Sequence, residues 1–148
     1  MQINAILIPE RIYANVPLKS KKKCIEYIAH KAANTYPGLI EEEIYSALIA
    51  RERLGSTTLD YGIALPHARL PRLQEPFGLF IRLREGILFD EPNSKKIDLI
   101  FALFVPEEID KTHLQLLSHI AEKLKSAVIR HEVRQATNPN IIYEQLCS

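Results

Sequence analysis

A histidine that ends an apolar run is the first candidate for chemistry in this sequence. The stretch from Gly62 to Arg69, GIALPHAR, passes through apolar residues to Pro66 and then reaches His67. The proline restricts the backbone just before the imidazole because its φ angle is fixed. Histidines are the main chemical resource of the chain, which has five of them.

A second histidine belongs to a predicted helix that begins at Thr112. At about 100° per residue, His113 falls on the apolar side of this helix and His119 on the opposite side. The apolar side also holds Leu114, Leu116, Leu117, Ile120, Ala121 and Leu124. The sequence Thr112 to Gln115 matches a capping box, which predicts Thr112 as N-cap and His113 as the first helical residue. There the helix dipole would favour a neutral imidazole and attract an anion; the alternative is a core-edge histidine bonded to a carbonyl.

Arg51 is the other residue that breaks a pattern. On the helix predicted from Glu41, the same geometry puts it within the apolar stripe, between Ile44 and Ala47. A guanidinium on a buried stripe needs a partner. It either extends past the stripe or pairs with a carboxylate such as Glu52, or it binds a planar carboxylate or a phosphate through its fork of donors.

Several classes of site and partner are disfavoured. His113 and His119 have a zinc-like spacing, but they point apart and no cysteine pair accompanies them. The two cysteines, Cys24 and Cys147, form no CxxC motif, so neither a disulfide framework nor a cysteine zinc site is expected. The formal net charge of +1 argues against nucleic acid as a partner. We expect no metal and no cofactor.

The charged and apolar runs of the sequence predict solvent-exposed helix faces and no membrane span. We interpret the run Lys21 to Lys23 as the solvated face of an amphipathic helix, and His30 and His131 as solvated. The N-terminus has no basic segment followed by a long apolar one, and no apolar stretch approaches the about 18 residues of a membrane span. We expect a soluble, cytoplasmic protein without membrane insertion.

The elements that must position these residues follow from the periodicity. The length of 148 residues and the hydrophobic fraction of 47% predict one domain spanning residues 1–148. Predicted helices cover Lys21 to about Tyr36, opened by Ser20, then Glu41 to Leu54, stopped by Gly55, then Thr112 to about Ser126, Val128 to Ala136, and Ile141 to Leu146. Predicted strands are Gly62 to Pro66, Phe77 to Leu83, and Ile97 to Pro106, the last buried on both faces. Helices before and after a block of strands imply an α/β/α layered fold.

With these residues in place, the chain resembles a known family. The stretch ARERLGSTTLDYGIALPHARL, from Ala50 to Leu70, is similar to the signature of the IIA domains of the bacterial phosphoenolpyruvate-dependent phosphotransferase system, in the fructose, mannitol and nitrogen-regulatory branch. The similarity continues through IDLIFALFVP and KTHLQLLSHIAEKL. It implies a three-layer α/β/α sandwich around a small mixed sheet. Within the branch, the chain resembles the nitrogen-regulatory members most.

The resemblance assigns roles to the unusual residues. His67 matches the histidine that accepts the phosphoryl group, His113 the second active-site histidine, and Arg51 an arginine that contacts the phosphoryl group. Ser56 and Thr57 match the family's GST turn and are candidate phosphate contacts. Asp60 departs from the glycine-rich pattern, and a carboxylate beside a phosphohistidine would repel it. Asp60 therefore either points away or orients an imidazole.

The implied function is a phosphohistidine carrier and phosphotransferase component. The donor would be a histidine-phosphorylated carrier protein of the HPr type, because no GxxxxGK[ST] nucleotide loop occurs, and regulatory target proteins would read the phosphorylation state. Two alternatives stay open. One is a sugar-specific IIA component that passes phosphate to a IIB domain, and the other is a non-catalytic interaction module with the same fold.

Overall fold

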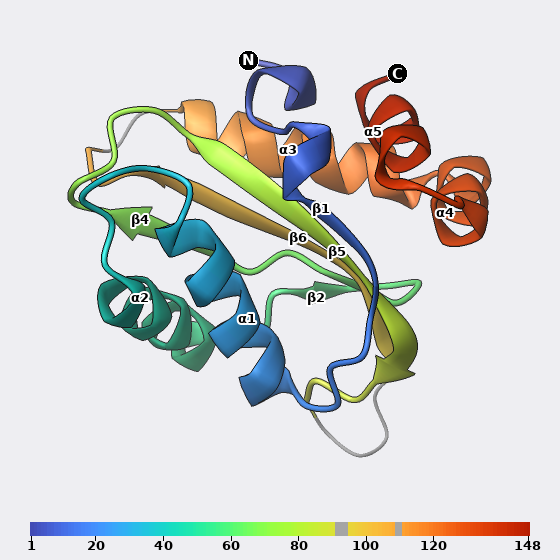
Figure 1. Ribbon diagram of the computed structural model, residues 1–148, viewed down its shortest axis with the longest axis horizontal. Helices are drawn as coiled ribbons and strands as arrows, with labels where there is room; N and C mark the ends of the chain where they lie inside the picture. Colours follow the sequence, from blue (N-terminus) through green and yellow to red (C-terminus); the bar gives the residue numbers. More distant parts are fainter. Residues whose placement is uncertain (91–94, 109–110) are drawn as a thin grey trace.

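A mixed β-sheet between two layers of helices forms the molecule (Figure 1). The computed structural model describes residues 1–90, 95–108 and 111–148. The strands are β1 (Ile12–Val16), β2 (Thr58–Leu59), β3 (Ile63–Ala64), β4 (His67–Leu70), β5 (Phe77–Ile87) and β6 (Ile97–Pro106). The α-helices are α1 (Lys21–Ala33), α2 (Glu41–Leu54), α3 (Thr112–Lys125), α4 (Ala127–Gln135) and α5 (Pro139–Cys147), and two 3₁₀ turns cover Ile3–Ala5 and Pro9–Arg11. The predicted α/β/α sandwich is confirmed.

Strand β6 is the centre of the sheet and has the bounds that its apolar run predicts. The sheet order is β1-β5-β6-β3-β2, and β4 pairs with β6 beyond β3. Strand β5 is antiparallel to β6 on one side, while β3 and β4 run parallel to it on the other. Neighbours on both sides explain why every residue from Leu99 to Val105 is buried.

The two faces of β6 supply two separate cores. Ile100, Ala102 and Phe104 pack in the core that α1 and α2 cover. The residues between them, such as Phe101 and Leu103, pack in the core that α3, α4 and α5 cover. Side chains on a strand alternate between its faces, so one continuous apolar run serves both layers.

Helix α1 forms as its sequence predicts. Ser20 caps it, since its hydroxyl accepts a hydrogen bond from the Lys23 amide at 3.1 Å. The buried residues are those of the predicted stripe, Cys24, Ile25, Ile28, Ala29 and Ala32. Burial raises the pKa of the Cys24 thiol to about 12, and neither cysteine forms a disulfide.

The strands differ from the sequence-based predictions. Strands β1, β2 and β4 were not predicted, and only Ile63–Ala64 of the GIALP stretch is a strand. Strands β1, β2 and β4 are too short to show a clear alternation of apolar and polar residues. They form because they pair with β5, β3 and β6, respectively. The hairpin between β2 and β3 turns through Tyr61 (φ 69°) and Gly62 (φ 82°), both in the left-handed region.

The start of α3 also differs. Thr112 is its first helical residue and Lys111 its N-cap, so the predicted capping box is wrong. Leu114 is 63% exposed, which corrects its placement on the apolar side, whereas His119 is exposed as expected. The buried positions of the helix are Leu116, Ile120 and Leu124. In the described part of the chain, no helix combines the length and apolarity that a membrane span requires.

Candidate functional site

His67 is the first residue of β4, at the point where the chain rejoins the sheet after Leu65 and Pro66. Its backbone is held by parallel pairing with Leu103 of β6 and by the hydrogen bond from the Leu103 amide to the Pro66 carbonyl at 3.0 Å. The imidazole is half-buried. The sheet therefore fixes the backbone of His67 while one side of the ring stays accessible.

Two contacts define the tautomer of the His67 ring. Nδ1 lies 2.8 Å from the carbonyl oxygen of Leu65, and a carbonyl can only accept, so Nδ1 carries the proton. On the other side, Nε of Arg51 donates to Nε2 of His67 at 3.2 Å. An arginine only donates, so Nε2 presents a lone pair. Nε2 is the atom available for nucleophilic attack.

Arg51 reaches this ring from the last turn of α2. Besides its contact with His67, its Nη1 donates to the Gly55 carbonyl at 2.9 Å. The sequence left open whether Arg51 pairs with Glu52 or serves a site. In the structure its hydrogen bonds go to His67 and to the loop that follows α2, so the guanidinium stands beside the nucleophile candidate.

His113 enters the site from the first turn of α3. It is half-buried, and it lies close enough to His67 for its charge to act on that ring. His113 also lines a pocket of about 220 Å³, together with Gln74, Pro76, Glu108 and Thr112 among others. The residues that the sequence analysis singled out on three separate segments, His67, Arg51 and His113, are therefore brought together.

The environment of His67 favours a neutral ring. Burial lowers its pKa most, and the charges of Arg51 and His113 lower it further. The hydrogen bond to Leu65 and the charge of Glu52 raise the pKa, but the net effect lowers it below the ordinary value of 6.5. Near neutral pH the imidazole is uncharged and can act as a nucleophile.

The hydroxyls of Ser56 and Thr57 are engaged by carboxylates. Ser56 Oγ donates to Asp90 at 2.7 Å, and Thr57 Oγ1 donates to Glu52. Thr57 is only 6% exposed. The structure thus places both residues on the loop after α2, with the Ser56 hydroxyl bonded to Asp90 and the Thr57 hydroxyl bonded to Glu52.

Asp60 lies at a distance from the site. It is exposed in the turn before β3, whereas His67 follows β3. The partners of Ile63 and His67 on β6 are Leu99 and Leu103, and a separation of four residues along a strand is about 13 Å. The Leu65 carbonyl, and not a carboxylate, orients the imidazole.

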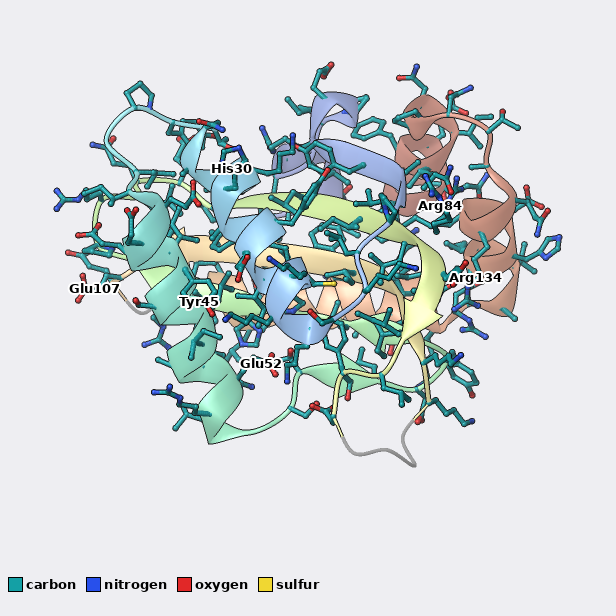
Figure 2. All side chains as sticks on the ribbon, turned by 60° about the horizontal axis from the view of Figure 1, so that its bottom comes forward. His30, Tyr45, Glu52, Arg84, Glu107 and Arg134 are labelled. Atoms are coloured by element: carbon teal, nitrogen blue, oxygen red, sulfur yellow. The ribbon has the colours of Figure 1, made fainter. Side chains whose placement is uncertain are left out.

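Lys21 corrects another expectation. It is not part of a solvated face, because its Nζ forms ion pairs with Glu52 at 2.9 Å and with Asp90 at 3.1 Å. Figure 2 shows Glu52 between the N-terminal end of α1 and the C-terminal end of α2. Sequence reasoning missed this cluster, since its members are far apart in the chain and the buried position of Glu52 beside Arg51 was the only local signal. Within the described residues, no group of His, Cys, Asp and Glu could hold a metal ion.

Comparison with known proteins identifies the family. The family model described as "Phosphoenolpyruvate-dependent sugar phosphotransferase system, EIIA 2" matches residues 5–148. The chain belongs to this family. All of the candidate site, from Arg51 to His113, lies within the matched residues.

Relatives in this family place the chain in the expected branch. It is 36% identical over 146 residues to a nitrogen regulatory protein of Bradyrhizobium diazoefficiens, covering 99% of this chain and 95% of the relative. A nitrogen regulatory protein of Pseudomonas aeruginosa is 38% identical over 144 residues, with 97% and 94% covered. The crystal structure of the nitrogen regulatory protein IIA-Ntr from Neisseria meningitidis superposes with a TM-score of 0.91 at 34% identity, covering 97% of this chain and 98% of that one. The predicted resemblance is confirmed.

Proposed function

We propose that the chain is a phosphohistidine carrier in which Nε2 of His67 accepts a phosphoryl group from a histidine-phosphorylated carrier protein of the HPr type. The observation that carries this proposal is the position of Arg51, whose Nε lies 3.2 Å from Nε2 of His67. The Nδ1 contact with Leu65 at 2.8 Å supports it, because it keeps the lone pair on Nε2. The coarser function, a component of the phosphotransferase system, rests on the family itself.

The transfer balances without a metal or a separate base. The Nε2 lone pair attacks phosphorus in line, the new N–P bond forms, and the N–P bond to the donor histidine breaks with its electron pair returning to the donor ring. The donor ring, protonated on its other nitrogen, leaves as a neutral imidazole, and the positive charge passes to the His67 ring. The proton on Nδ1 stays where it is, bonded to Leu65. Arg51 then turns its donors from Nε2 to the phosphoryl oxygens, and His113 faces them from α3.

We propose that the phosphorylated and free forms are distinguished by regulatory target proteins in the cytoplasm. A dianion added at a half-buried ring changes both the charge and the shape of the surface around β4. The names of the relatives in Bradyrhizobium and Pseudomonas support a regulatory role over sugar transport.

A labelling experiment tests the proposal. The phosphorylated carrier is offered to the parent protein, to His67→Ala and to His30→Ala, a matched control since His30 is exposed and pairs with Glu41. We expect an acid-labile, alkali-stable label on the parent and on His30→Ala, and none on His67→Ala. Normal labelling of folded His67→Ala would overturn the assignment. Rapid transfer from the labelled parent to a sugar-specific IIB domain would replace the regulatory role by the transport role.

A further inference from the structure

Glu52 is a buried carboxylate beside the site that the transfer step itself does not use. Its side chain is 8% exposed, although it neighbours Arg51 in sequence. One oxygen, Oε1, accepts the hydrogen bond from Thr57, and the other, Oε2, faces Lys21 Nζ at 2.9 Å. A buried charge is costly unless it is paired and hydrogen-bonded, and Thr57 and Lys21 supply one partner to each oxygen of Glu52.

A continuous path of hydrogen bonds leads from Glu52 to the His67 ring. Glu52 holds the Thr57 hydroxyl. The Thr57 carbonyl accepts from the Leu65 amide at 2.9 Å, and the Leu65 carbonyl receives Nδ1–H of His67 at 2.8 Å. The path therefore connects the side chain of Glu52 to the carbonyl that accepts Nδ1–H of His67.

The loop is tied down on both sides of Thr57. Ser56 donates to Asp90 at 2.7 Å, and Thr58 donates to the same carboxylate oxygen at 3.3 Å. Lys21 joins Asp90 to Glu52. Burial raises the pKa of Asp90, but the hydrogen bond from Ser56 and the charge of Lys21 lower it more, so Asp90 is ionised at neutral pH. The cluster anchors the loop to the start of α1.

We propose that Glu52 is a positioning residue for His67, which through Thr57 and the backbone of Leu65 holds the ring in the tautomer with Nδ1 protonated and Nε2 free. In this role Thr57 connects Glu52 to the backbone of Leu65 and is not a phosphate contact. The consequence for transfer rates rests on the proposed function, whereas the consequence for the tautomer does not.

The test uses the unphosphorylated protein, so its outcome is independent of any donor. The ¹⁵N chemical shifts of the His67 ring are measured by NMR in the parent, Thr57→Val, Thr57→Ser and Thr58→Val. Thr57→Val removes the donor at nearly constant shape, and the loss of one hydrogen bond changes an equilibrium by about 2- to 10-fold. In Thr57→Val we expect a shift of that size toward the tautomer with Nε2 protonated. Thr57→Ser should restore the parent tautomer, and the shift should be smaller in Thr58→Val, which removes the 3.3 Å hydrogen bond to Asp90.

A second variant separates charge from hydrogen bonding. Glu52→Gln keeps an oxygen that accepts from Thr57, so the tautomer is expected to stay as in the parent. The negative charge of Glu52 raises the pKa of His67, so the titration midpoint of His67 is expected to fall in this variant. Parent-like ¹⁵N shifts in folded Thr57→Val, or a changed tautomer in folded Glu52→Gln, would overturn the proposal. A normal tautomer response together with an unlabelled parent would instead reject the proposed carrier function.

Discussion

Replacing Arg51 by alanine is the most direct perturbation of the proposed transfer step. The substitution removes the donor at 3.2 Å from Nε2 of His67 and the one at 2.9 Å from the Gly55 carbonyl. In the proposed transfer the phosphoryl group arrives on Nε2, beside the guanidinium, whose positive charge would stabilise its oxygens. Arg51 is half-buried at a helix end, and we expect the variant to fold.

The magnitude follows from the loss of one preorganised charged group. Such a loss costs on the order of 10² to 10³ in rate, equivalent to about 2.7 to 4 kcal/mol of transition-state stabilisation. A pH dependence accompanies it. Burial lowers the pKa of His67 most and Arg51 lowers it further, so the pKa rises in the variant. More of the ring is then protonated at mildly acidic pH, and the defect is expected to be larger at about pH 6 than at about pH 8.

The assay is rapid-quench transfer from the labelled carrier at several pH values. Arg53→Ala is the matched control, because it removes the same charge from an exposed position on the same helix turn. We expect the control to transfer within a few-fold of the parent. A comparable defect in Arg53→Ala, or a rate for Arg51→Ala within about threefold of the parent, would refute the proposed role of the Arg51 guanidinium in stabilising the transferring phosphoryl group.

Two further predictions use the histidines. His113→Ala should slow transfer by about 10², while His119→Ala, exposed on the other side of α3, should match the parent in the same assay; the reverse result would show that the wrong face of the helix had been assigned to the site. The pKa of His67 lies below the ordinary 6.5 in the folded protein, so the unfolded chain binds a proton at this residue more readily. The contribution of His67 to the free energy of unfolding therefore falls as the pH drops below about 7. Urea unfolding of His67→Gln should show a weaker loss of stability between about pH 7 and pH 5 than the parent, and equal slopes would contradict the pKa shift.

The long elements and the unusual residues could be predicted from the sequence. The stripe of α1, the Ser20 cap and the bounds of β6 are local patterns, because burial of one face imposes a period on consecutive residues. Arg51 and His67 stood out for a related reason, since each breaks such a period. Residues 50 to 70 also carry the family signature, which is a property of the sequence alone.

What the tertiary structure alone decided is which groups meet. Arg51 contacts the ring of His67, sixteen positions further along the chain. Helical periodicity does not predict a contact between residues on two different elements. Lys21, Glu52 and Asp90 form one cluster only because the start of α1, the end of α2 and the segment after β5 converge. The short strands β2 and β4 are stabilised by backbone pairing with β3 and β6, respectively. The amino-acid pattern thus determined the candidate nucleophile, and the tertiary structure determined which charged groups surround it, because periodicity is a property of neighbours in sequence and hydrogen-bond partners are neighbours in space.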